Sequence, residues 1–135
     1  MTERARPADR ADGEAPGLVV PSAPGSVALV RQYAVAACAA LGWADSADTV
    51  GLLVSEVATN AVLHAYGPEI RVRVLDRGPW LRVEVVDGSQ ALPVPRDAPD
   101  GAENGRGLAL VEALAVRWGV DSRPDGKTSW FELGV

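Results

Sequence analysis

The sequence predicts an α+β domain, a two-layer α/β sandwich in which helices cover one face of a mixed, mostly antiparallel sheet. Two early segments repeat apolar residues at the spacing of a helix, and two later segments alternate apolar and polar residues with the period of a strand. The chain has 135 residues and is 47% hydrophobic, which is enough for one domain with its own core. The predicted order of elements is β-α-α-β-β-loop-α-β-β.

The N-terminal half predicts one strand followed by two helices. A short β-leaning run ends at Pro21, which suits the edge of a sheet. Gly42 is expected to end the first helix as a C-cap, and Asp45 or Ser46 is expected to cap the start of the second. The predicted ranges are 18–20 for the strand and 27–41 and 45–65 for the helices, the last closed by Gly67-Pro68.

The C-terminal half predicts two hairpins separated by a long loop and a short helix. The loop, residues 87–104, is rich in proline, glycine and charge, a composition typical of a functional lid or of disorder. The first hairpin turns at Asp76–Pro79 and the second at Arg123–Gly126. The predicted ranges are 70–75, 80–86, 116–120 and 128–133 for the strands and 108–114 for the helix.

Composition excludes several classes of protein. The net charge of −5 argues against nucleic-acid or anionic-membrane binding as the main role. A single cysteine and a single histidine exclude a disulfide framework and a Cys-rich zinc site. Cys38 lies within the first helix and is expected to fill the core. We expect a cytoplasmic protein with a disordered polar tail over residues 1–16 and one domain over 17–135.

Three polar residues form a row on the second predicted helix. On a helical wheel Glu56, Asn60 and His64 fall in line, inside a broad apolar arc that runs from Leu52 and Leu63 at one edge to Val54 at the other. A buried carboxylate without a partner is costly, so the row indicates a polar floor under a ligand. The wheel puts small and polar residues on the opposite side: Gly51, Ser55 and Thr59.

This row has two interpretations. A glutamate can take a proton from an attacking hydroxyl, and an asparagine oxygen can hold a hard cation. Alternatively, the row lies at the rim of the sheet and only satisfies nearby backbone groups.

Two further motifs follow along the chain. Asp87-Gly88 ends a predicted strand, where a carboxylate could accept a hydrogen bond from an exocyclic amine or simply form an Asp-Gly turn. Gly105-Arg106-Gly107-Leu108 opens the short helix. Glycines there let phosphate oxygens approach the backbone N–H groups of a helix N-terminus, although short glycine motifs also recur by chance.

In order, the chain reads Glu56-x-x-x-Asn60, then Asp87-Gly88, then the loop, then Gly105-Arg106-Gly107-Leu108. This order resembles the ATP-binding domain shared by histidine kinases, gyrase and MutL, known as the GHKL or Bergerat fold. Within it, the compact chain is most similar to the stand-alone anti-sigma factor serine kinases of bacteria. The resemblance covers about residues 17–135.

The resemblance implies a role for each motif. Asp87 would bind the adenine amino group of ATP, with Gly88 beside it and Thr128 supporting the aspartate. Asn60 would bind the Mg²⁺ that bridges the phosphates. Glu56 would be the general base, and His64 would only order the site. The phosphate groups would be held at the third helix, by Gly105, Arg106, Gly107 and Leu108.

The resemblance also implies a function and partners. The chain would be a Mg-ATP-dependent protein serine kinase that phosphorylates an anti-anti-sigma-like partner and regulates transcription by partner switching, with a sigma factor as a further partner. The sequence leaves the oligomeric state open, a homodimer included. The first glycine box departs from the family pattern, because Ser89 and Gln90 follow Gly88. Two alternatives therefore stand, an ATP-gated binding module without significant kinase activity and an interaction domain that has lost ATP.

Overall fold

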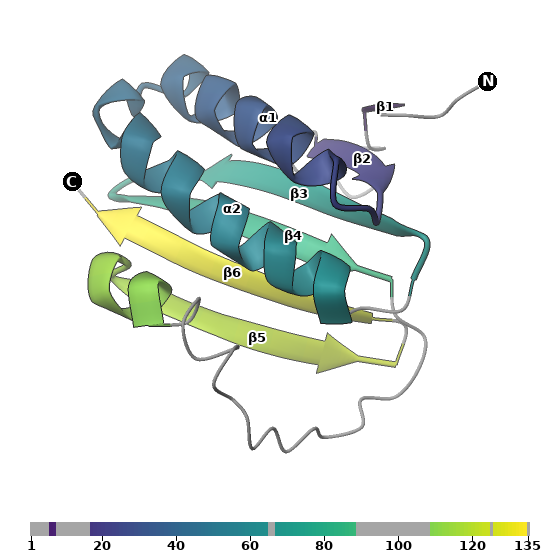
Figure 1. Ribbon diagram of the computed structural model, residues 1–135. Helices are drawn as coiled ribbons and strands as arrows, with labels where there is room; N and C mark the ends of the chain where they lie inside the picture. The colour runs from purple at the N-terminus through teal and green to yellow at the C-terminus, as the bar shows by residue number, and fades with distance from the viewer. Residues whose placement is uncertain (1–5, 8–16, 65–66, 89–108, 125, 135) are drawn as a thin grey trace.

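The computed structural model describes residues 6–7, 17–64, 67–88, 109–124 and 126–134 (Figure 1). Its sheet has six strands in the order β1-β2-β3-β4-β6-β5, and each described pairing is antiparallel. The predicted α+β class is therefore confirmed, and the sheet is antiparallel throughout these pairings instead of mixed. The strands are β1 Arg6–Pro7, β2 Gly17–Pro21, β3 Glu69–Asp76, β4 Trp80–Asp87, β5 Arg117–Arg123 and β6 Gly126–Gly134.

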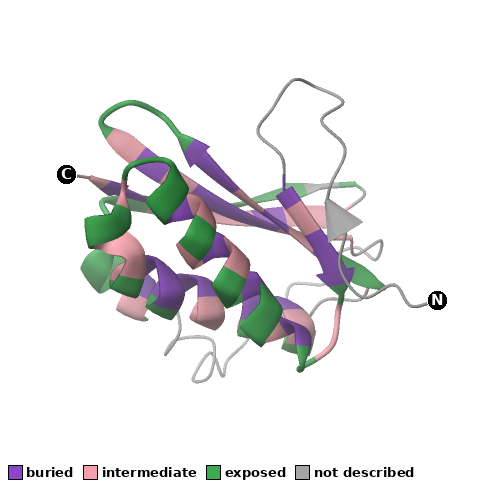
Figure 2. Ribbon diagram, turned by 90° about the horizontal axis from the view of Figure 1, so that it is seen from above, coloured by how far each residue is buried: buried purple, intermediate pink, exposed green. Residues whose placement is uncertain are grey.

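The helices form a single layer on one face of this sheet. Figure 2 shows this layer from above, with the buried residues gathered where helices and sheet meet. The main helices are α1 Ser26–Ala40 and α2 Ala47–His64, joined by a 3-10 turn, η1 Ala44–Ser46. A short helix over 109–114 precedes β5. Within the described ranges, neither main helix combines the length and apolar character needed to cross a membrane.

Glycine ends α1 as the sequence predicts. Gly42 has φ of +93°, the left-handed conformation that glycine adopts at little cost. Two backbone hydrogen bonds close the helix in a Schellman pattern, from Gly42 N to Ala39 O at 3.0 Å and from Trp43 N to Cys38 O at 2.9 Å. This end turns the chain sharply, so that α2 packs beside α1.

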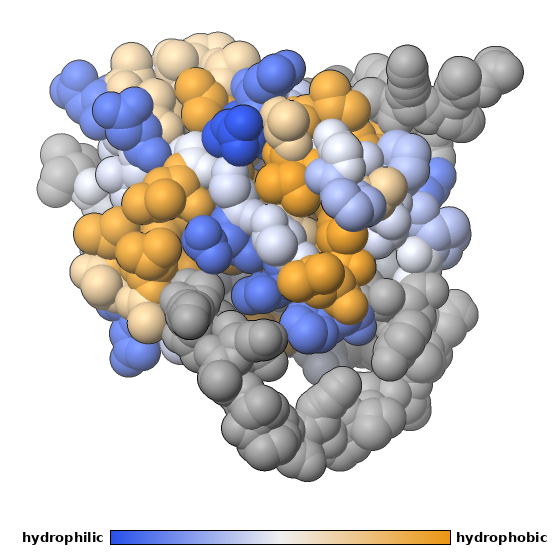
Figure 3. Space-filling view, viewed as in Figure 1, coloured by the Kyte–Doolittle hydropathy of each residue, from blue (hydrophilic) through white to orange (hydrophobic). Residues whose placement is uncertain are grey.

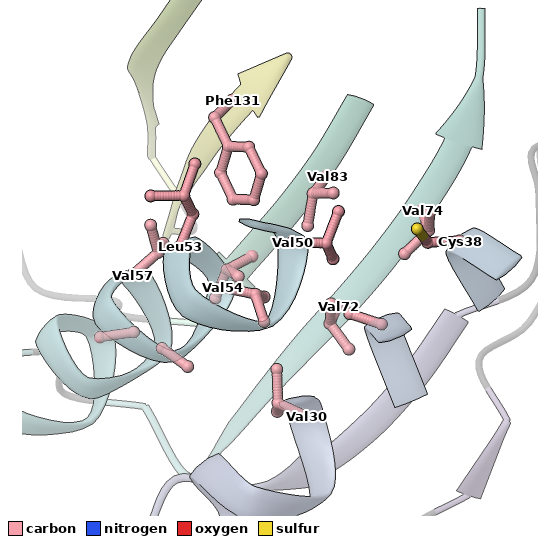
Figure 4. Close-up of a cluster of buried hydrophobic side chains, with 14 of the residues drawn as sticks. Val30, Cys38, Val50, Leu53, Val54, Val57, Val72, Val74, Val83 and Phe131 are labelled. Atoms are coloured by element: carbon pink, nitrogen blue, oxygen red, sulfur yellow. The ribbon is translucent and has the colours of Figure 1, made fainter. Parts of the chain in front are cut away.

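The core lies between the two layers. Residues opposite one another in the strand register share a face of the sheet. The pairs Val72–Val85 and Val74–Val83 of β3 and β4 therefore point toward the helices together. Phe131 of β6 is fully buried and is the largest such side chain. Figure 4 shows it in one cluster of buried side chains that also includes Leu53, Val57 and Val50 of α2, Val83 of β4, Val72 of β3 and Val30 of α1.

Cys38 belongs to this core, as the sequence predicts. The side chain is fully buried, and burial raises the pKa of the thiol. The thiol donates a hydrogen bond to the carbonyl of Trp43 at 3.1 Å. A buried, protonated thiol is a poor nucleophile, so Cys38 is a packing residue.

The face of the sheet away from the helices carries a network of charged side chains. Arg82 Nε donates to Glu84 Oε2 at 2.8 Å, and Arg82 Nη1 donates to Glu132 Oε2 at 3.0 Å. Burial alone would lower the pKa of Arg82, but these two bonds outweigh it and raise the pKa. The guanidinium also stacks 4.1 Å from the ring centroid of Trp130. Because both glutamates are only 7% exposed, this network links β4 to β6 as a packed polar layer.

Three elements differ from the sequence prediction. The second hairpin is longer than expected, because β5 runs to Arg123 and β6 begins at Gly126. Helix α2 begins at Ala47 because the 3-10 turn takes up the three residues before it. Arg6–Pro7, placed in the polar tail, pairs with Leu18 and Val19 of β2. Pairing between so short a segment and an edge leaves no periodic signal in the sequence.

Candidate functional site

Helix α2 carries the first group of predicted site residues. Glu56 and Asn60 are half-buried, and His64 at the end of the helix is exposed. Each lies four positions after the one before it, so their Cα atoms rise about 6 Å per step along one side of the helix. Within the described ranges no side-chain partner is seen for Glu56 or Asn60. Both polar groups are therefore presented at a partly open surface.

The apolar arc expected around this row is buried on one side of the row, at Val50, Leu53, Val54, Val57 and Ala61, but the prediction is wrong on the other side. Leu52 is 44% exposed and Leu63 is 65% exposed, so both lie outside the buried face of α2. Gly51, expected on the opposite side, is buried, and a Cβ built on it would lie 3.2 Å from Val35 of α1. The helix buries a face turned toward α1 as well as toward the sheet. A helical wheel represents one helix alone and therefore cannot reveal this second neighbour.

The row of Glu56 and Asn60 therefore lies at the rim of the buried face. Figure 3 shows this helical side of the molecule, where apolar patches alternate with hydrophilic ones. Leu52 and Leu63 are among the exposed large apolar residues of the described chain. A rim position places the carboxylate and the carboxamide where a ligand can reach them without opening the core.

Asp87 is the most buried of the predicted site residues that the structure describes. Its side chain is 2% exposed and its Oδ2 lies 3.4 Å from Nζ of Lys127, whose side chain is 33% exposed. Asp87 ends β4 and stands opposite Ile70 of β3, which faces the core under the helices. Helix α2 contacts β4, and Figure 1 draws the end of α2 across the arrowhead of that strand. The carboxylate therefore belongs to the helix-covered face, at its α2 end.

Two glycines hold the backbone around Asp87-Gly88. A Cβ built on Gly67 would lie 2.7 Å from the carbonyl of Gly88, and a Cβ built on Gly126 would collide with the carbonyl oxygen of Asp87. Gly126 also has φ of +150°. Only glycine fits at either position. The end of β4 is therefore in close contact with the backbone at Gly67 and at Gly126. The sequence predicted these glycines only as parts of turns, and their contact with the end of β4 was missed.

Thr128 lies on the other face of the sheet from Asp87. The register pairs Asp87 with Lys127 and pairs Thr128 with Val86. Successive residues of a strand point to opposite faces, and Thr128 is 4% exposed among the residues of the outer face. Lys127, and not Thr128, is thus the residue directly across from Asp87, and the supporting role expected of Thr128 stays a prediction. A strand register cannot be read from one sequence, and this is why Lys127 was missed.

A groove of about 380 Å³ opens at this end of the sheet. Asp87, Gly88 and Lys127 line it, but so do Arg71 and Thr128 of the outer face. The groove therefore opens mainly away from Glu56 and Asn60. We place the candidate site on the helix-covered side, because that is the side shared by α2 and by the carboxylate of Asp87.

The remaining predicted site residues, Gly105, Arg106, Gly107 and Leu108, lie outside the described residues, as does the loop from 89 onward. Their phosphate-binding role stays a prediction. Among the described residues no group of three or more His, Cys, Asp or Glu side chains is placed to hold a metal ion. A Mg²⁺ ion does not need such a cluster, because one carboxamide oxygen, water and the phosphates of a ligand would be enough to hold it. Asn60, half-buried and accessible, is the residue that would supply that oxygen.

Comparison with known proteins identifies the class of protein that this fold and site define. Residues 20–132 match the histidine kinase-like ATPase domain. The match spans most of the chain, so the chain belongs to the histidine kinase-like ATPase family. This confirms the resemblance to the GHKL ATP-binding domain found in the sequence.

Two known proteins are similar to this chain over part of their length. An uncharacterised protein of Streptomyces coelicolor is 45% identical over 58 residues, which are 42% of this chain and 54% of that protein. The chain thus spans about half the length of this curated relative. The histidine kinase domain of the Erythrobacter litoralis blue-light activated histidine kinase has a similar fold, with a TM-score of 0.50 and 22% identity over 85% of this chain and 61% of that chain.

Replacing Gly126 with alanine should destabilise the protein and displace Asp87. The added Cβ would meet the carbonyl oxygen of Asp87, so β6 must shift away from the end of β4. We expect the free energy of unfolding to fall by about 3 kcal/mol, more than backbone strain alone costs. Chemical denaturation measures this loss.

The matched control is Gly78→Ala. Gly78 also has positive φ, +79°, but nothing lies within 4 Å of the position that the alanine Cβ would take. This variant carries the backbone strain without the collision. Equal losses for the two variants would mean that the close approach to Asp87 does not matter.

Proposed function

We propose that the chain is a Mg-ATP-dependent protein serine kinase of the anti-sigma regulatory type. The observation that supports this most is the pair Glu56 and Asn60, half-buried one helical turn apart at the rim of α2, in a member of the histidine kinase-like ATPase family. A domain that only packs against other proteins has no need of a carboxylate and a carboxamide at this place. The buried Asp87 at the adjoining strand end supplies an acceptor for the adenine amine.

Glu56 is the proton acceptor in this proposal. As the serine oxygen of a partner attacks the γ-phosphorus, its O–H bond breaks and the proton passes to the Glu56 carboxylate. The new O–P bond forms while the bond from the γ-phosphorus to the bridging oxygen breaks, and ADP leaves. Phosphoryl transfer depends mostly on positioning and charge neutralisation, so a short set of residues is sufficient.

Asn60 holds the cation in this proposal. A bound Mg²⁺ would neutralise phosphate charge, and the carboxamide oxygen would fix it beside α2. Since Asn60 is one turn from Glu56, the cation and the base would act on the same end of the nucleotide. His64 is exposed at the end of α2. In this proposal it contacts no ligand and contributes only by being part of that helix.

The partner in this proposal is an anti-anti-sigma-like protein that carries the acceptor serine, and a sigma factor is a second partner. Binding of such proteins would be controlled by phosphorylation of the first. The test is incubation of the purified chain with Mg-ATP and an anti-anti-sigma-like protein from the same genome, followed by mass spectrometry for phosphoserine. Phosphoserine that depends on both the chain and Mg-ATP is expected.

One observation favours a second function. Gly88 is followed by Ser89 and Gln90, so the first glycine box of the family is incomplete. An ATP-gated binding module would bind Mg-ATP and change its affinity for a partner without transferring phosphate. Partner binding that changes with Mg-ATP, together with no phosphoserine, would select this alternative.

A further inference from the structure

Lys127 and Asp87 form a donor and an acceptor side by side. The two residues stand directly opposite each other in the register of β4 and β6, with Nζ 3.4 Å from Oδ2. The carboxylate is buried, whereas the side chain of Lys127 remains 33% exposed. Lys127 is also the only lysine in the chain. The ammonium group is therefore held in place by Asp87, and a ligand can still reach it from the exposed side.

The position of Lys127 is set by the backbone before it. Gly126 passes so close to Asp87 that no other residue fits there, and this approach holds the start of β6 against the end of β4. The next residue along β6, Lys127, then has to face the same side as Asp87. The pair is thus built into the sheet and does not depend on a flexible surface contact.

The adenine ring matches this pair. Its edge carries an exocyclic amine, which donates, next to ring nitrogen N1, which accepts. Asp87 alone satisfies the amine and leaves N1 without a donor. We propose that Lys127 donates a hydrogen bond to N1 while Asp87 accepts one from the amine, so that Lys127 determines the specificity of the site for adenine. This inference rests on the proposed nucleotide site.

The same geometry disfavours guanine. A guanine ring bound in the same orientation would present its carbonyl oxygen to the Asp87 carboxylate and its N1–H to the Lys127 ammonium. Acceptor would face acceptor and donor would face donor, which costs binding energy at a buried group. The pair therefore selects by repulsion as well as by attraction.

The test uses the full chain and isothermal titration calorimetry with Mg-ATP and with Mg-1-deaza-ATP, in which a C–H group replaces N1. The unmodified chain should bind the deaza analogue about tenfold more weakly, as expected for loss of one charged hydrogen bond. Lys127→Met should bind Mg-ATP about tenfold more weakly and should no longer distinguish the two nucleotides. Arg77→Met, which removes a positive charge from an exposed turn, should behave as the unmodified chain.

A second measurement uses the unmodified chain and therefore does not require a variant that folds. Because Lys127 is the only lysine, an amine-selective reagent labels one side chain, and mass spectrometry separates it from the N-terminal amine. Mg-ATP should slow labelling of Lys127 more than Mg-1-deaza-ATP does at the same occupancy.

The outcomes separate this inference from the proposed function. Equal affinity of the unmodified chain for the two nucleotides, with equal protection of Lys127, would overturn the role of Lys127 and leave ATP binding intact. Failure to bind either nucleotide would overturn both proposals.

Discussion

Replacing Asp87 with asparagine should weaken binding of Mg-ATP about 10- to 100-fold, the range expected for a buried, charge-assisted hydrogen bond. Asparagine keeps the shape of the side chain but removes the negative charge that lies beside Lys127 and that would accept the hydrogen bond from the adenine amine. The carboxylate is only 2% exposed, so water cannot replace the lost interaction cheaply. Isothermal titration calorimetry of the variant and the unmodified chain measures the change.

Asp76→Asn is the matched control. Asp76 is exposed at the far end of β3, and its Oδ1 accepts a hydrogen bond from the backbone N–H of Gly78 at 3.2 Å. Asparagine can accept the same bond, so this variant makes the same chemical change away from the site. Unchanged nucleotide affinity in Asp87→Asn, relative to this control, would remove Asp87 from the site.

Replacing Glu56 with glutamine should slow phosphoryl transfer about 10²- to 10⁴-fold, as loss of a general base does. Glutamine has nearly the same shape but cannot take the serine proton. Glu56 lies at the rim of α2 and outside the core cluster, so the fold and the affinity for Mg-ATP should be preserved. The rate of phosphoserine formation on the partner and calorimetry with Mg-ATP separate the two effects.

Glu112→Gln provides the control for this charge removal. Glu112 is exposed on the helix 109–114. Its variant should transfer phosphate at the rate of the unmodified chain. If Glu56→Gln keeps that rate as well, then the proton leaves by another route and Glu56 is a structural residue.

Periodicity was sufficient to predict most of the fold. The alternating segments became β3 and β4, and Asp87 lies at the strand end where the sequence placed it. Gly42 ends α1 because only glycine takes its conformation readily, a rule that applies to the residue itself. Such features depend only on residues that are close in the sequence, so they can be predicted from one sequence.

The features that were missed depend on neighbours in space. Burial of Gly51 requires α1 to pack beside α2, and exposure of Leu52 follows from the same rotation of the buried face. The pairing of Asp87 with Lys127 requires the register between β4 and β6, strands that are far apart in the sequence. No periodic pattern within one segment specifies either arrangement.

The central claim is that a single nucleotide site lies between the rim of α2 and the end of β4. The measurement that tests it most directly is thermal unfolding of the chain with and without Mg-ATP. A ligand that binds only the native state stabilises it by mass action, by about 2.7 kcal/mol at a concentration 100-fold above Kd. We predict that the melting temperature rises steadily with Mg-ATP concentration, and a melting temperature that stays constant across that titration would contradict the claim.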